Sequence, residues 1–140
     1  MSFAAIRQVA LALSLVAVTS LAPSPLLKAA QAEQQQASLV EYSETTDLAA
    51  LAKKGPTVIF FFATWCPNCI LTLTELSEKW DQIDPGATVV IADYDRETEL
   101  KAKYGVTHQD TFVLLDADAG AAKLWNAGGI ATLNENLRGK

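Results

Sequence analysis

The chain has 140 residues, half of them of hydrophobic type, and a formal net charge of −5 at neutral pH. This length allows one domain with enough apolar material for a core and leaves no room for a second. The acidic balance disfavours nucleic acid and anionic membrane surfaces as partners. With two cysteines and one histidine, the chain also has too few ligands for a four-thiolate zinc site.

Residues 1–32 have the pattern of a secretory signal peptide. Arg7 precedes an apolar run over residues 9–21, and residues 30–32 (Ala-Gln-Ala) have the small-x-small form of a cleavage site. Cleavage after residue 32 removes Arg7, Lys28 and no acidic residue, so the formal charge becomes −7. The alternative is an uncleaved membrane anchor, although the apolar run is shorter than the roughly 20 residues that span a bilayer. The sequence thus predicts an exported protein, periplasmic or otherwise extracytoplasmic, where protein disulfides form and persist.

The first part of the domain is expected to lead into a buried strand. Residues 33–38 are rich in Gln, Ala and Glu and suit a flexible lead-in, which leaves residues 39–140 for the domain. Residues 39–42 suit a short edge strand, and Asp47 offers a cap for a short helix. Residues 57–63 form a nearly continuous run of Val, Ile and Phe, the pattern of a strand buried on both faces.

An amphipathic helix is expected to follow that strand. Its apolar positions are 73, 76, 80 and 83, and the Asp-Pro-Gly turn at residues 84–86 ends it. Residues 88–92 suit a second buried strand. The acidic residues that follow, at 93, 95, 97 and 99, lack the glycine and later glutamate of a calcium loop, so a solvated strand end and helix start explain them better.

The last third of the chain predicts a short helix, a hairpin and a final helix. Gly105 closes the helix over residues 100–104. Residues 112–115 and 122–126 suit two strands joined by a turn, and residues 130–137 suit the last helix. The whole order predicts an α/β fold, with parallel strands in its first half and an antiparallel hairpin in its second.

Both cysteines lie in residues 65–69, between the buried strand and the amphipathic helix. Pro67 suits the first helical position, which would place Cys66 against the free amides of the helix N-terminus. A thiolate is stabilised there, so the pKa of Cys66 can fall from about 8.5 toward roughly 3.5 to 7.5. Cys69 lies one turn further on the same side. Cys66 is therefore the predicted nucleophile and Cys69 the resolving thiol; a permanent disulfide or part of a metal site are the alternatives.

The sequence resembles the thioredoxin superfamily over nearly all of residues 33–140. Residues 61–69 (FFATWCPNC) are similar to that family's strand-to-active-site segment, and residues 104–107 (YGVT) and 111–114 (TFVL) to its later segment. The resemblance implies a thioredoxin-like fold with a central mixed β-sheet flanked by helices. It also implies an exported protein that exchanges disulfides with other proteins, with Cys66 as the attacking and Cys69 as the resolving thiol.

Two positions depart from the family pattern. The family usually has a cis-proline just before the position of Thr111, where it shapes the substrate groove; here that residue is Asp110. The family also commonly buries an aspartate six residues before the first cysteine; here that residue is Phe60. If Asp110 faces Cys66 as a carboxylate, it opposes the thiolate and favours the reductase direction. The alternative is that Asp110 turns outward and replaces a rigid loop with a flexible one.

The predicted function is thiol–disulfide exchange on exported proteins, in the reductase direction, with a redox partner that the sequence does not identify and no cofactor. The alternatives are a carrier of copper(I) or another soft metal, with His108 or Asp110 beside the cysteines, and an inactive interaction module. No nucleic acid is expected as a partner, and a membrane only if the N-terminal segment is uncleaved. The predicted site comprises the cysteines Cys66 and Cys69, the active-site loop residues Trp65, Pro67 and Asn68, and the substrate-groove residues Asp110 and Thr111.

Overall fold

The computed structural model describes residues 36–139. The predicted signal peptide and the first half of the predicted lead-in, residues 33–35, lie outside the described residues. The first strand begins at Ser38, one residue earlier than expected. None of the helices in the described part of the chain is long and apolar enough to cross a membrane.

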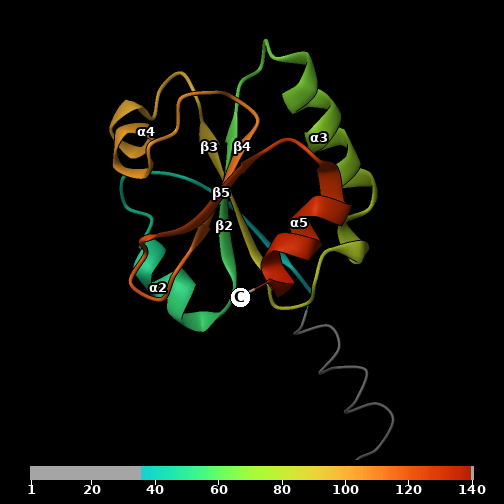
Figure 1. The fold of residues 1–140 in the computed structure, drawn as a ribbon, viewed down its shortest axis with the longest axis horizontal. Coiled ribbons are helices and arrows are strands. Elements are labelled where there is room, and N and C mark those ends of the chain that lie inside the picture. The colour runs from blue at the N-terminus through green and yellow to red at the C-terminus, as the bar shows by residue number, and fades with distance from the viewer. Residues whose placement is uncertain (1–35, 140) are drawn as a thin grey trace, which may run out of the picture.

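A five-stranded mixed sheet forms the centre of the molecule, in the order β1-β3-β2-β4-β5 (Figure 1). The strands are β1 (Ser38–Glu41), β2 (Thr57–Phe62), β3 (Thr88–Asp93), β4 (Thr111–Leu115) and β5 (Ala121–Asn126). β2 pairs in parallel with β3 and antiparallel with β4, and β4 and β5 form the predicted antiparallel hairpin. β1 and β5 are the two edges.

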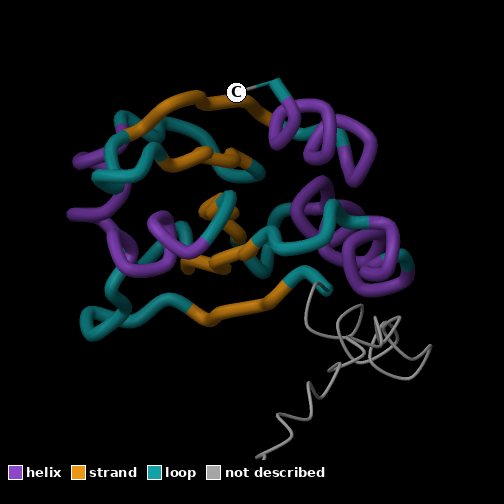
Figure 2. The backbone as a smooth tube through the Cα atoms, turned by 90° about the horizontal axis from the view of Figure 1, so that it is seen from below, coloured by secondary structure: helices purple, strands orange, loops and turns teal. Residues whose placement is uncertain are grey.

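Helices cover both faces of this sheet (Figures 1 and 2). They are α2 (Leu48–Lys54), α3 (Pro67–Glu78), the short 3₁₀ turn η1 (Trp80–Gln82), α4 (Thr98–Tyr104) and α5 (Gly129–Arg138). One core cluster joins α3 and α5 to the sheet, and a second joins α2 and α4 to its other face. The predicted α/β class, with a central mixed sheet flanked by helices, is confirmed.

The central strand β2 explains why the sheet needs cover on both faces. Its residues from Thr57 to Phe61 are fully buried, as the apolar run predicts. The ring of Phe60 stacks on Phe112 of β4, with centroids 4.5 Å apart, and Phe112 stacks on Trp125 of β5 at 5.4 Å. β2 is therefore a buried, well-packed strand, and the cysteine segment begins just after its last residue.

The helix after the cysteines is shorter than expected. α3 ends at Glu78, because Lys79 leaves the helical region with φ −126° and ψ 33°. The 3₁₀ turn η1 then carries Trp80, so apolar spacing alone did not locate the end of the helix. The indole nitrogen of Trp80 donates to the Ala37 carbonyl at 3.0 Å, which fixes this turn against the start of β1.

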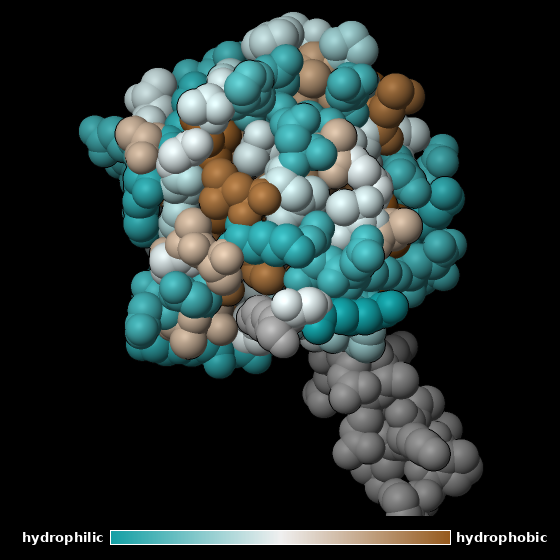
Figure 3. Space-filling view, viewed as in Figure 1, coloured by the Kyte–Doolittle hydropathy of each residue, from teal (hydrophilic) through white to brown (hydrophobic). Residues whose placement is uncertain are grey.

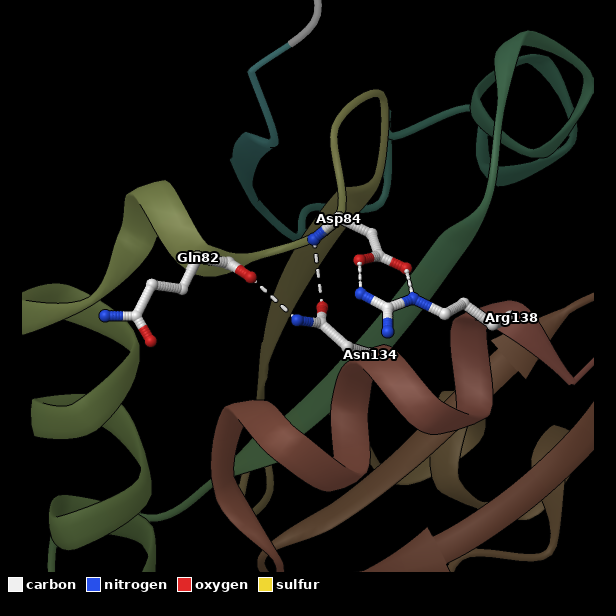
Figure 4. Close-up of polar contacts among 4 residues, drawn as sticks. All are labelled: Gln82, Asp84, Asn134 and Arg138. Atoms are coloured by element: carbon white, nitrogen blue, oxygen red, sulfur yellow. Dashed lines mark hydrogen bonds and ion pairs between the residues drawn. The ribbon is translucent and has the colours of Figure 1, made fainter.

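Polar contacts tie α5 to the turn that follows η1 (Figure 4). The buried Asn134 amide donates to the Gln82 carbonyl at 2.7 Å and accepts from the Asp84 backbone N–H at 2.9 Å. The exposed Arg138 guanidinium forms a two-pronged ion pair with the Asp84 carboxylate, with Nε 2.8 Å from one oxygen. This end of the sheet lies away from the cysteines and supports the fold rather than the site.

Hydrophilic side chains cover most of the face shown in Figure 3, and hydrophobic ones form small separate patches there. Over the described residues, the exposed large hydrophobic side chains are Leu39, Trp65, Ile70, Leu71 and Leu124. Three of these five belong to the cysteine loop and the first turns of α3. Exposed apolar side chains thus gather beside the cysteines.

Candidate active site

Cys66 lies where the buried strand gives way to a helix. β2 ends at Phe62, and Cys66 is the N-cap of α3 in an extended conformation, followed by Pro67 at the start of the helix as predicted. The Cys66 sulfur accepts a hydrogen bond from the Cys69 backbone N–H at 3.2 Å. The first amides of a helix have no partner within it, so this sulfur faces the positive end of α3.

The two thiols are both free and differ in burial. Cys66 is 3% exposed and Cys69 is fully buried. Burial raises the pKa of the Cys69 thiol to about 12, and its hydrogen bond with Cys66 adds to the rise, whereas a backbone contact with Ala63 opposes it. Cys69 is therefore a protonated thiol at neutral pH, and Cys66 is the more exposed of the two residues.

The three predicted loop residues beside the cysteines, Trp65, Pro67 and Asn68, are all exposed. Trp65 is 59% exposed, and its indole nitrogen donates to the Asp95 carboxylate at 2.7 Å. Asp95 lies just after β3, the parallel neighbour of β2. We did not predict Asp95 as a site residue, although the carboxyl ends of two parallel strands meet at one edge of a sheet.

The other acidic residues of this segment stabilise a turn. The Asp93 carboxylate accepts hydrogen bonds from the backbone N–H groups of Asp95 and Arg96 at 2.8 and 3.1 Å. Among residues 36–139, no three His, Cys, Asp or Glu side chains are grouped so that they could hold a metal ion. His108 is exposed, and its Nδ1 lies 2.9 Å from the Thr107 hydroxyl. Neither His108 nor Asp110 therefore completes a three-ligand site with the cysteines.

Asp110 is buried, so the alternative that it turns outward is wrong. It is 3% exposed, has a φ of 60°, and neither of its carboxyl oxygens has a hydrogen-bond partner among the described residues. Burial raises the pKa of Asp110, and the nearby Thr72 hydroxyl partly offsets the rise. The charge of Asp110 contributes to the raised pKa of Cys69. The structure thus links Asp110 to the buried thiol of Cys69, an effect that we did not predict from the sequence.

The loop that carries Asp110 is fixed by its backbone. The Asp110 N–H donates to the Phe61 carbonyl at 3.0 Å, and the Asp110 carbonyl accepts from the Ala127 N–H at 2.9 Å. The Asn126 side-chain amide donates to the Gln109 carbonyl at 2.8 Å and lies 3.2 Å from both the Asp110 carbonyl and the hydroxyl of Thr111. We did not predict a role for Asn126, because the sequence does not show that it pairs with Thr111 across the hairpin.

The sheet order, the covering helices and a Cys-x-x-Cys pair at the start of the helix after the central strand define a thioredoxin-like thiol oxidoreductase. The model of the AhpC/TSA family matches residues 25–135, and the chain belongs to this family. The resemblance to the thioredoxin superfamily is thereby confirmed.

Known thioredoxins resemble the chain over about two thirds to three quarters of its length. Thioredoxin Asp f 28 of Aspergillus fumigatus is 29% identical over 92 residues, which are 64% of this chain and 82% of that protein. The crystal structure of Schistosoma mansoni thioredoxin matches with a TM-score of 0.59 and 26% identity, covering 72% of this chain and 94% of that one. Fasciola hepatica thioredoxin matches with a TM-score of 0.58 and 25% identity, covering 71% and 95%.

Proposed function

We propose that this protein reduces disulfides of exported proteins by thiol–disulfide exchange, with Cys66 as the attacking and Cys69 as the resolving sulfur. The observation that carries this proposal is the position of Cys66 as the N-cap of α3, with the Cys69 N–H on its sulfur at 3.2 Å. A helix N-terminus stabilises a thiolate, which is the reactive form of cysteine. The second sulfur lies one turn away, within reach of the first.

The reaction has two exchange steps. The Cys66 thiolate attacks one sulfur of the substrate disulfide, that bond breaks, and the other substrate sulfur leaves as a thiolate that takes a proton from water. Cys69 then loses its proton and attacks the Cys66 sulfur, which releases the substrate as a dithiol. Two electrons pass to the substrate, the pair becomes a disulfide, and a dithiol redox partner returns it to the reduced form.

The protonation of Cys69 in the reduced, dithiol form of the pair favours the reductase direction. A pair is a strong oxidant when ionisation stabilises its reduced form. Here burial keeps the pKa of Cys69 at about 12, so ionisation of this thiol adds no stability to the reduced form at neutral pH. We expect a potential nearer to about −270 mV than to the roughly −120 mV of strongly oxidising pairs.

Protein substrates fit the surroundings of the cysteines. Trp65, Ile70 and Leu71 are exposed apolar side chains next to or just after the pair. Exposed apolar groups of this kind mark contact sites for other proteins when they gather in one place. The signal-peptide pattern of residues 1–32 supports a periplasmic or other extracytoplasmic setting, in which these substrates would be exported proteins.

Trapping of mixed disulfides tests the proposal. Cys69→Ala should hold substrate proteins through Cys66 in bonds that dithiothreitol releases, and Cys66→Ala is the matched control that should hold none. Titration of the native pair against glutathione would then measure its potential. A pair that does not interconvert between dithiol and disulfide would refute the function, and stoichiometric copper in the purified protein without disulfide turnover would favour the carrier.

A further inference from the structure

Asp110 is a buried carboxyl group whose position the thiol chemistry described above does not yet explain. It is 3% exposed, and both oxygens lack hydrogen-bond partners among the described residues. Leaving a buried polar group unpaired destabilises the folded state, and the cost is larger when the group is charged. A left-handed backbone at a residue other than glycine adds to this cost. Asp110 is therefore held in an unfavourable place by its surroundings.

The surroundings place the carboxyl group against the buried side of α3. The Thr72 hydroxyl lowers the pKa of Asp110, and the charge of Asp110 raises the pKa of Cys69. Both of these partners are buried residues of α3, three positions apart, and so lie on one face one turn from each other. The Asp110 carboxyl group thus lies near the Cys69 sulfur and away from solvent.

Among residues 36–139, the other groups that contact Asp110 or its loop supply no second acid or base. The Phe61 carbonyl and Ala127 N–H bond the backbone of Asp110, and the Asn126 amide faces the loop carbonyls. His108 lies in the same loop but is exposed and bonded to Thr107. The sulfur of Cys66 accepts a hydrogen bond from the Cys69 backbone N–H. Asp110 is thus the carboxyl group placed to exchange a proton with Cys69.

Resolution of a mixed disulfide requires such an acceptor. Cys69 must lose its proton before it attacks the Cys66 sulfur, yet its pKa is about 12 and it is fully buried, so water and hydroxide have poor access to it. A positioned base typically accelerates a proton-transfer step by about 10² to 10⁴-fold. A carboxyl group with a raised pKa is a stronger base, and is better matched to this task, than an ordinary one.

We infer that the Asp110 carboxylate accepts the Cys69 proton during resolution, and that Asn126 is a positioning residue that holds the Asp110 loop for this transfer. The inference rests on the proposed function. The S–H bond of Cys69 breaks as its proton passes to a carboxylate oxygen, the sulfur bonds to Cys66, and the substrate sulfur leaves as a thiolate. Asp110 later returns the proton to water, or to Cys69 when the pair is reduced again.

A two-phase reaction with one equivalent of 5,5′-dithiobis(2-nitrobenzoate) separates the two steps. Attack by Cys66 releases the first coloured thiolate and resolution by Cys69 releases the second, so Cys69→Ala gives the first phase alone. For Asp110→Asn, we expect a first phase within about twofold of the native rate and a second phase about 100-fold slower at neutral pH. The second phase should then rise tenfold per pH unit, whereas in the native protein it levels off above the pKa of Asp110.

Two further variants test the assignment. Glu99→Gln removes the same charge from an exposed position on α4 and should leave both phases unchanged. Asn126→Ala should slow the second phase but keep its plateau with pH, because the carboxylate is still present. Asp110→Ser should repeat the loss seen with Asp110→Asn, so the conclusion does not depend on one variant folding well.

The outcomes distinguish the inference from the proposed function. A second phase in Asp110→Asn with the native rate and pH profile, or equal slowing of both phases, would overturn the role of Asp110. Absence of the first phase in the native protein would contradict the proposed function itself.

Discussion

Replacing Asp110 by asparagine should make the reduced protein more stable at neutral pH and leave it unchanged in acid. The side chain keeps its size and loses its charge, at a site that is 3% exposed and offers neither oxygen a hydrogen bond from the described residues. A buried polar group without a partner costs about 1 to 3 kcal/mol. The substitution removes the buried charge at neutral pH, so we expect a gain of about 1 to 2 kcal/mol there.

The sign of the pH dependence follows from the raised pKa of Asp110. The unfolded chain loses this proton at its ordinary pKa, near 4, whereas the folded chain keeps it to a higher pH. Between the two values the folded state binds more protons, so its stability falls as pH rises. The stabilising contribution is fully present below the unfolded pKa and is lost as pH passes through the folded pKa. Asparagine does not titrate, so the two proteins should agree at pH 3 and diverge toward pH 7.

Urea unfolding of both reduced proteins at a series of pH values measures this difference. Other titrating groups contribute equally to both curves and cancel in the subtraction. Glu99→Gln, which removes an exposed carboxylate, should show no such divergence. A difference that is constant with pH, or a native protein that gains stability over the variant as pH rises, would refute the argument that the Asp110 carboxyl group is buried without compensation.

Further substitutions and one labelling experiment test the rest of the structure. Asn134→Ala should cost about 1 to 3 kcal/mol in urea unfolding because it leaves two partly buried backbone groups without partners. Arg138→Ala should cost clearly less than Asn134→Ala because its ion pair is exposed to solvent. Gly129→Ala should cost about 1 to 3 kcal/mol, measured the same way, because φ is 60° there and a side-chain carbon would meet a carboxylate of α3. Iodoacetamide at pH 8 should label Cys66 and spare the buried Cys69, as peptide mass spectrometry would show; equal labelling would contradict their assigned order.

The sequence was most informative where local rules act alone. The apolar run of β2, Pro67 at the helix start and Gly105 in a left-handed conformation are each set by a few neighbouring residues, and all three predictions are confirmed. The end of α3 was less predictable, because Trp80 keeps the apolar spacing while the backbone turns at Lys79. Local pattern therefore located the cysteines well and the length of their helix poorly.

The residues that were missed act across the sheet. Asp95 accepts a hydrogen bond from Trp65, which is 30 residues away in the sequence. Asn126 donates a hydrogen bond to the Asp110 carbonyl, which is 16 residues away in the sequence. Such contacts depend on which strands are neighbours, and the sequence suggests this order without fixing the pairing of single residues. The burial of Asp110 was undecided for the same reason, since a change of one residue in loop register would turn it outward.

The position of β5 at the margin of the sheet has a consequence for how the protein responds to heat. This strand pairs on one side, most of its residues are exposed, and the hydrogen bonds from Asn126 and Ala127 at its end hold the loop beside the cysteines. Edge strands can separate from a sheet in local openings that need less free energy than global unfolding. Reactivity should therefore decline on warming several degrees before the cooperative melting transition, while the amides of β2 are still protected from hydrogen exchange.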